Sequence, residues 1–150
     1  MRIPEHLSYE EMSTLPGAAV TAYNALLGPK PLKAGDVVLV QGTGGVSVFA
    51  LQFAVASGAT VIATSSSDKK LALAKTLGAK HLINYKTTPD WHEEVLKITG
   101  GDGADHIIEV GGPATLMKSV QCVRHGGSIN MIGYLAGVSH ACSLFPGDCR

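Results

Sequence analysis

The sequence of 150 residues has no excess of charge of either sign, because 12 Lys and Arg residues balance 12 Asp and Glu residues. A protein that binds nucleic acid or an anionic membrane surface usually presents a basic face, so neither partner is expected. No apolar run approaches the roughly 18 residues of a membrane-spanning helix. The first residues also lack the apolar segment of a secretory signal. We therefore expect a cytoplasmic protein.

Cysteine is scarce, and its three occurrences, Cys122, Cys142 and Cys149, form no C-x-x-C pair. An odd number of unclustered cysteines argues against a disulfide framework and against a structural zinc site. No two of the six histidines stand at the spacing of a helical metal-ligand pair, H-x-x-x-H. We expect one buried thiol, two thiols near the C-terminus and no metal site.

The sequence does contain a regular alternation of short apolar runs and helical patterns, with glycines at the junctions. The apolar runs predict five strands, at 37–41, 60–64, 81–84, 104–110 and 127–133. Helical spacing predicts helices at 45–57, 69–77, 91–99 and 114–124, and two more before the first strand, separated at Pro16 and Gly17. Strands that alternate with helices pair in parallel through right-handed crossovers. We therefore expect an α/β fold with a doubly wound parallel sheet in three layers, αβα.

The longest of these helices shows the clearest pattern of apolar residues. Five apolar residues recur at helical spacing and are expected to face the sheet: Val46, Phe49, Ala50, Phe53 and Ala54.

The junction after the first predicted strand, Gly42-Thr43-Gly44-Gly45-Val46-Ser47, has the glycine pattern of a dinucleotide-binding βαβ unit. Glycines let the backbone approach a pyrophosphate, and the following helix offers free N–H groups and the positive end of its dipole. Ser47 stands where a third glycine is usual. We interpret it as a small residue that serves the same close packing of helix against strand. A glycine pattern alone is weak evidence for a dinucleotide site, so this prediction also depends on the position of the pattern between a predicted strand and a predicted helix.

With these residues in place, the chain from about Ile3 to Gly137 resembles the cofactor domain of medium-chain dehydrogenases and reductases, the zinc-type alcohol dehydrogenase and quinone reductase superfamily. The motifs that carry the resemblance occur in the family's order: the entry helix 15–26, the glycine turn, Leu77-Gly78-Ala79 with Ile83-Asn84-Tyr85, Asp105 to Gly112, and Gly126-Gly127-Ser128. The resemblance implies a Rossmann sheet. It also implies hydride transfer between a nicotinamide cofactor and a carbonyl, an alcohol or an activated double bond.

The resemblance divides the chain into a dinucleotide-binding domain over 1–137 and a divergent tail over 138–150. In the family, a catalytic domain lies mostly before the segment where this chain begins, and it carries the zinc ligands or the substrate pocket. That N-terminal catalytic domain is absent from this sequence. We therefore expect a truncated form of such an oxidoreductase, arising from a gene model, a splice form or a fragment. Its catalytic residues and its substrate are unassigned.

The end of the second predicted strand bears on the choice of cofactor. NAD-selective proteins place a carboxylate there, about 20 residues after the glycine turn, whereas this sequence has Ser65 and then Ser66. A carboxylate would repel the extra phosphate of NADP, while hydroxyls and an ammonium group favour it. The resemblance to the quinone-reductase branch implies that Ser66, Lys70 and Tyr85 meet that phosphate. We expect NADP to be preferred over NAD.

Two alternatives stay open for this loop. Residues 65–67 are also explained as a polar loop and helix cap, with Lys69 and Lys70 on a solvated face. Asp68 is expected to cap the helix, but it would face the ribose if the loop were shifted by a few residues.

The resemblance places the nicotinamide side of the cofactor near Gly111 and Gly112 and near Ile132 and Gly133. A plain tight turn explains the first pair equally well. Taken together, the expected cofactor-binding residues are Gly42, Thr43, Gly44, Gly45, Val46, Ser65, Ser66, Lys70, Tyr85, Gly111, Gly112, Ile132 and Gly133.

Two other classes of function stay open beside an NADP-dependent oxidoreductase present as its cofactor-binding domain. A non-catalytic nucleotide-binding module would share the fold and would form a homodimer through the sheet edge near Gly127 to Gly133, since an unpaired edge invites association. A methyltransferase also has a glycine-rich first turn, but it would need an acidic residue where Ser65 stands. The expected partners are a nicotinamide dinucleotide and, if a catalytic domain is supplied, a small-molecule substrate.

Overall fold

The computed structural model describes residues 4–135 and 137, and in them five parallel strands form one sheet in the order β3-β2-β1-β4-β5. The strands are β1 (Val37–Gln41), β2 (Thr60–Ser65), β3 (His81–Asn84), β4 (Ala104–Glu109) and β5 (Val123–Met131). The chain reverses direction across the sheet after β3, because β4 pairs with β1 and not with β3. The expected doubly wound α/β fold is confirmed.

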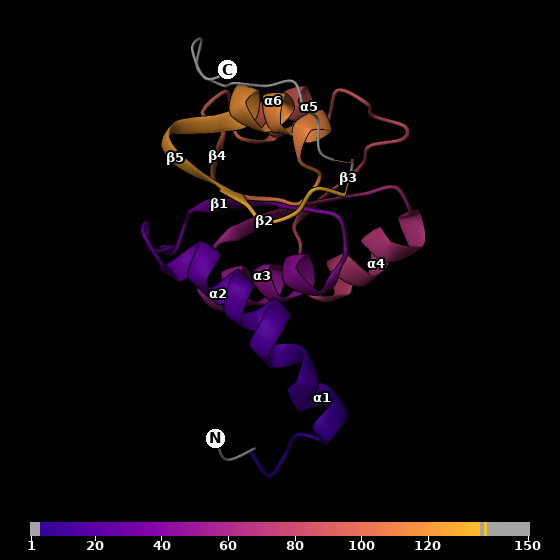
Figure 1. Cartoon of the computed structure of the whole chain (residues 1–150). Coiled ribbons are helices and arrows are strands. Elements are labelled where there is room, and N and C mark those ends of the chain that lie inside the picture. The colour runs from indigo at the N-terminus through magenta and orange to yellow at the C-terminus, as the bar shows by residue number, and fades with distance from the viewer. Residues whose placement is uncertain (1–3, 136, 138–150) are drawn as a thin grey trace, which may run out of the picture.

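Helices cover both faces of the sheet (Figure 1). Three of them lie on one face: α2 (Val20–Leu27), α3 (Gly45–Ala56) and α4 (Asp68–Thr76). The other face carries α5 (Trp91–Ile98) and α6 (Pro113–Cys122). In the described part of the chain, every helix is too short or too polar to cross a bilayer.

The central strand β1 separates two apolar clusters because its side chains alternate between the two faces. Val38 and Val40 pack with the α3 side, where Ala50 and Ala54 are buried. Leu39 packs on the opposite side, in the cluster that contains Trp91 of α5. This burial on both faces explains why β1 is an unbroken apolar run.

The predicted separation of two helices at Pro16 and Gly17 is wrong. Both residues lie in η1 (Leu15–Ala19), a π-helical segment that joins α1 (Tyr9–Thr14) to α2 without a break. The N–H of Val20 reaches back five residues to the carbonyl of Leu15, so the helical backbone continues past Pro16 as a π turn. The hydroxyl of Thr21 satisfies the carbonyl of Gly17 at 2.8 Å.

The start of the last strand also differs from the prediction. β5 begins at Val123, so Arg124 lies in a strand and not in a helix. The guanidinium of Arg124 lies 2.8 Å from the carboxylate of Asp105 in β4, and this ion pair stabilises the extended backbone. The register between the two strands shifts between Ala104 and His106, as at a β-bulge. A shift in strand register produces no periodic pattern in the sequence, so the sequence did not predict it.

The expected buried face of α3 is correct only in part. Ala50 and Ala54 are fully buried, but Phe49 and Phe53 keep partial exposure. The ring of Phe53 instead meets Tyr23 of α2 edge to face, with 6.3 Å between the centroids. Because α3 is covered by the sheet and by α2, it has apolar residues on more than one face.

Candidate functional site

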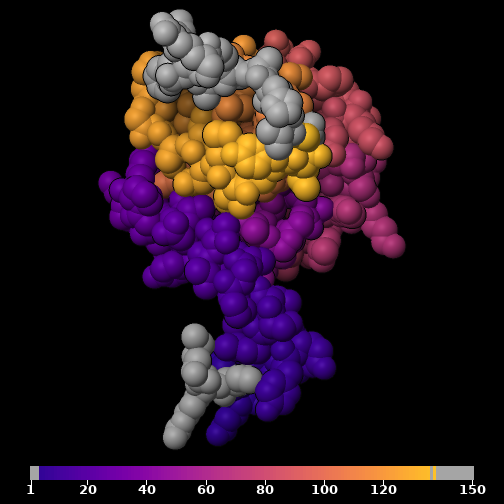
Figure 2. Space-filling view, in the orientation of Figure 1, coloured from indigo at the N-terminus to yellow at the C-terminus, as the bar shows by residue number. Residues whose placement is uncertain are grey.

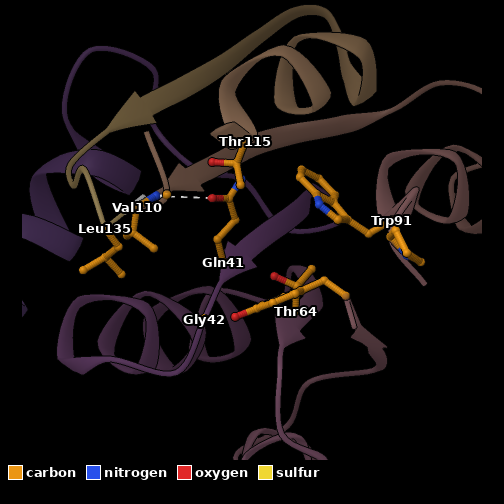
Figure 3. A pocket seen from close by; sticks show the side chains of 10 residues that line it. Gln41, Gly42, Thr64, Trp91, Val110, Thr115 and Leu135 are labelled. Carbon is orange, nitrogen blue, oxygen red and sulfur yellow. Dashed lines mark hydrogen bonds between the residues drawn. The ribbon is translucent and has the colours of Figure 1, made fainter. Parts of the chain in front are cut away.

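A cavity of about 390 Å³ opens at the carboxyl ends of the strands, between the sheet and the layer of α5 and α6. Figure 3 shows Trp91 and Leu135 on opposite sides of it and the side chain of Gln41 between them. Ligands of doubly wound sheets bind at this edge, where the order of strands reverses. The cavity is lined by Gln41, Gly42, Thr64, Tyr85, Pro89, Trp91, Val110, Gly111, Thr115 and Leu135.

The glycine turn forms the entrance of this cavity and the start of α3. Gly42 has a φ of +69°, which only glycine adopts without strain. Gly44 is the N-cap of α3, and no side chain caps that end of the helix. A Cβ atom placed on Gly44 would meet nothing within 4 Å. The turn therefore presents open backbone N–H groups and a positive helix end, which suit an anion such as a pyrophosphate.

Ser47 has the packing role that we inferred from the sequence. Its side chain is 3% exposed, and its hydroxyl donates to the carbonyl of Gln41 at 2.7 Å. The first turn of α3 is thereby attached to the end of β1. Gly45 packs on the other side, where a Cβ atom would lie 3.2 Å from Ala18.

The residues of the serine loop occupy different environments. Ser65 is buried, and its backbone carbonyl accepts from the N–H of Tyr85 at 3.1 Å. Ser66 is half-buried and Lys70 is exposed. Lys70 lies beside Gly42 and Thr43 in a small recess next to the main cavity, and Tyr85 lines the cavity itself. Lys70 and Tyr85 therefore line two different hollows that both include Gly42.

Asp68 does not face this site. Its carboxylate accepts a hydrogen bond of 2.7 Å from the side chain of Asn84, at the end of β3. Both residues line a separate groove, and Asp68 lines neither the main cavity nor the Lys70 recess. The loop is not shifted toward the arrangement in which Asp68 would meet a ribose.

The turn after β4 meets the end of β5 closely. Gly111 lines the cavity, and Gly112 caps α6. Gly133 lies against the same turn, since a Cβ atom on it would be 2.8 Å from the carbonyl oxygen of Val110. Ile132 lies beside these residues but lines a different groove, which it shares with α2.

A buried carboxylate that sequence reasoning missed lies below the cavity. Glu109, at the end of β4, is 0% exposed and accepts hydrogen bonds from Gln41, Gly111, Gly112, Thr115 and Ser119. The available signals were a glutamate at the end of the buried strand β4 and a glutamine at the end of the apolar strand β1.

Metal-binding and nucleophilic groups are sparse in the described residues. Within residues 4–135 and 137, no three His, Cys, Asp or Glu side chains converge as a metal site requires. Burial raises the pKa of the Cys122 thiol to about 12, so it is an unreactive core residue. The prediction of one buried thiol is confirmed. Cys142, Cys149 and the predicted tail over 138–150 lie outside the described residues.

Comparison with known proteins identifies the family. The model of the zinc-binding dehydrogenase family matches residues 45–147. A zinc-type alcohol dehydrogenase-like protein of Schizosaccharomyces pombe is 58% identical over 135 residues, which are 89% of this chain and 39% of that protein. A 2-haloacrylate reductase of a Burkholderia species is 35% identical over 142 residues, which are 93% of this chain and 42% of that enzyme.

Solved structures agree with this assignment. A mycobacterial protein complexed with NADPH superimposes with a TM-score of 0.86 at 28% identity, over 95% of this chain and 44% of that one. The chain spans about two-fifths of the length of the curated relatives described above. It corresponds to their Rossmann-like cofactor-binding domain. The chain thus belongs to the zinc-binding dehydrogenase family of medium-chain dehydrogenases and reductases.

Proposed function

We propose that this chain binds a nicotinamide dinucleotide along the carboxyl edge of its sheet, as the cofactor domain of an NADP-dependent oxidoreductase of the alcohol dehydrogenase-like and quinone reductase-like class. The observation that carries the proposal is the uncapped N-terminus of α3 beside the Gly42 turn, at the entrance of the cavity. Its N–H groups and dipole would hold the pyrophosphate. The mycobacterial protein of similar structure is complexed with NADPH, which supports a nicotinamide dinucleotide as the ligand.

The cavity suits part of a dinucleotide cofactor. Its walls are largely apolar, with Trp91, Pro89 and Val110 among them, and Thr115 and Tyr85 contribute polar atoms. A cavity of about 390 Å³ is within the usual size of small-ligand sites. A dinucleotide whose pyrophosphate is held at the N-terminus of α3 would extend into this cavity.

The side chains around the recess support NADP over NAD. Lys70 lines the same small recess as Gly42 and Thr43, and its side chain carries an ammonium group. The first carboxylate after β2, that of Asp68, is bound to Asn84 on another surface. A 2′-phosphate would therefore meet Lys70, Ser66 and Tyr85 and no opposing negative charge.

The bound cofactor supplies the hydride, while the residues of this domain bind it and orient it. Reduction of an activated double bond is one candidate reaction, since a 2-haloacrylate reductase is among the relatives. The substrate pocket is expected in the part of the relatives that this chain does not span.

Titration calorimetry of the folded chain with NADPH and with NADH tests the proposal. We expect NADPH to bind about tenfold more tightly or better, a difference of about 1.4 kcal/mol. Lys70→Ala should weaken NADPH binding and leave NADH binding unchanged. Lys69→Ala, on the same exposed turn, is the matched control and should change neither. Equal or reversed affinities for the two dinucleotides would overturn the NADP assignment.

A second candidate function is a non-catalytic nucleotide-binding module that dimerises. The observation in its favour is that β5 pairs only with β4 in the described sheet, which leaves its other edge unpaired near Gly127 to Gly133. Cofactor binding without NADPH oxidation in the presence of aldehydes, quinones and enones would favour this function. NADPH oxidation with any of them would exclude it. Light scattering would report whether the chain forms a dimer.

A further inference from the structure

We propose that Glu109 is the positioning residue of the cofactor site, because its buried carboxylate holds the turn after β4 against the end of β1. This inference rests on the proposed cofactor binding. Glu109 lies below the cavity and does not line it. It would therefore act through the residues that it holds and not by touching the cofactor.

One carboxylate oxygen fixes the turn that follows β4. Oε1 accepts from the N–H of Gly111 at 2.9 Å, from the N–H of Gly112 at 3.1 Å and from the hydroxyl of Thr115. The turn is packed tightly on this oxygen and on Thr115, since a Cβ atom on Gly111 would lie 2.2 Å from the hydroxyl oxygen of Thr115. Gly111 and Thr115 line the cavity, so this oxygen determines the shape of one wall.

The other carboxylate oxygen fixes the end of β1. Oε2 accepts from Nε2 of Gln41 at 2.6 Å and from the hydroxyl of Ser119. The amide oxygen of Gln41 in turn accepts from the N–H of Val110 at 3.4 Å, as Figure 3 shows. Gln41 directly precedes Gly42, so the same carboxylate connects both glycine turns that border the cavity.

The hydrogen bonds of Glu109 explain why a carboxylate and not an apolar side chain stands at this position. Among the described residues, none of the ion pairs includes Glu109, so its charge is offset by hydrogen bonds alone. An apolar side chain would fill the same space without the cost of removing a charge from water. It would not accept the two glycine N–H groups, which would then be buried donors without partners. The carboxylate thus provides a defined geometry of the site that an apolar residue would not.

The pairing of an acid with an amide allows a sharp test by exchange of the two side chains. In Glu109→Gln, the NH₂ group of the new amide meets another donor in either orientation. On one side it meets the NH₂ group of Gln41, and on the other the N–H groups of the glycine turn. In Gln41→Glu, the introduced carboxylate lies against the carboxylate of Glu109, so two negative charges repel each other. In the double variant Gln41→Glu/Glu109→Gln, every group regains a partner. The amide introduced at position 109 would accept from the turn and donate to the carboxylate introduced at position 41, and that carboxylate would also accept from Ser119 and Val110.

Titration calorimetry with NADPH and amide hydrogen exchange are measured on the wild type, both single variants and the exchange variant. We expect Glu109→Gln to weaken NADPH binding about tenfold or more and the exchange variant to recover most of that loss. The amides of Gly111 and Gly112 should exchange faster in Glu109→Gln and recover their protection in the exchange variant. Val95→Ala, a buried α5 residue away from the turn, controls for lost stability and should leave NADPH affinity unchanged.

The outcomes separate this inference from the proposed function. If the wild type binds neither NADPH nor NADH, the proposed function is overturned, and the exchange rates of the two glycine amides still decide whether Glu109 holds the turn. If the wild type binds NADPH and Glu109→Gln binds it equally well, the positioning role is overturned and the proposed function stands. If Glu109→Gln does not fold, the exchange variant decides: recovered folding with lost NADPH affinity contradicts the inference, and recovery of both supports it.

Discussion

Asp68 accepts a hydrogen bond of 2.7 Å from Asn84, so the first acidic residue after β2 is attached to the end of β3 and lies away from the cofactor cavity. Asp68→Asn retains an oxygen that accepts from Asn84 and removes the charge. We expect this variant to change the ratio of NADPH to NADH affinity by less than about twofold, because an exposed charge outside the site is screened by salt. Titration calorimetry with both dinucleotides measures this ratio. A tenfold gain in NADPH affinity would mean that Asp68 faces the 2′-phosphate.

The glycine turn offers a substitution that separates binding from folding. Gly44 has an ordinary φ of −77°, and a Cβ atom on it would meet no protein atom within 4 Å. Gly44→Ala reduces the entropy of the unfolded chain but loses the preference of the N-cap for glycine over alanine, so we expect the free energy of unfolding to change by less than about 1 kcal/mol. The added methyl group occupies the space through which a pyrophosphate approaches the backbone, so we expect dinucleotide affinity to fall about tenfold or more.

Gly17→Ala is the matched control for that experiment. Its Cβ atom also enters open space, but on η1 and outside the cavity. It should stabilise the helix by up to about 1 kcal/mol without changing dinucleotide affinity. Thermal unfolding and titration calorimetry on both variants check the two effects. Unchanged affinity in Gly44→Ala would show that the turn does not contact the ligand.

The stability of the fold should depend on pH through His106. This residue is fully buried in β4, with Nδ1 2.9 Å from the hydroxyl of Ser128 and Nε2 3.4 Å from the carboxylate of Asp36. Burial lowers the pKa of His106 from its ordinary value of 6.5, against the opposing effect of Asp36. The folded chain thus binds a proton here less readily than the unfolded chain. The free energy of unfolding should fall as the pH drops below about 6.5, by at most about 1.4 kcal/mol per pH unit for one proton.

Urea unfolding between pH 5 and pH 8 measures this dependence. His106→Gln removes the titrating group, while the remaining histidines stay in both proteins. The difference between the two free energies of unfolding should therefore be constant above about pH 6.5 and change as the pH falls below it, because only the wild type loses stability through His106. Parallel curves at all pH values would contradict the assignment to His106.

Short sequence patterns predicted those strands and turns whose conformation depends on residues that are neighbours in the chain. The run from Val37 to Gln41 and the turn at Gly42 are determined by neighbouring residues, so their pattern predicted both strand and turn. The π-helical passage through Pro16 was not predictable from a rule that treats proline as a helix breaker, because a wider turn reconnects the backbone there. The early start of β5 depends on Arg124 reaching Asp105 in another strand.

The residues of the candidate site also fall into a group that the sequence predicted and a group that it did not. Glycine spacing indicated the residues that surround the α3 N-terminus, and the resemblance indicated Lys70 and Tyr85. Glu109 was not predicted because its role depends on Gln41, a partner that is distant in the chain. Gln41 lies 68 residues before it, and Ser119 lies 10 residues after it. No short motif contains such a set. A glutamate at the end of a buried strand is nevertheless a signal, since a buried charge requires partners.

The N-terminal helix α1 projects from the body of the molecule and contains no buried residue (Figure 2). Its six residues are held by the capping box of Ser8 and Glu11 and by continuity with η1. A helix of this length has almost no stability of its own in water. Its amides should exchange with solvent through local fraying, whereas those of α2, whose buried residues pack in the core, should exchange only when the whole domain opens. The two ends of one continuous helical segment thus differ in free energy of opening by almost the entire stability of the domain, and a melting curve of the sheet reports nothing about α1.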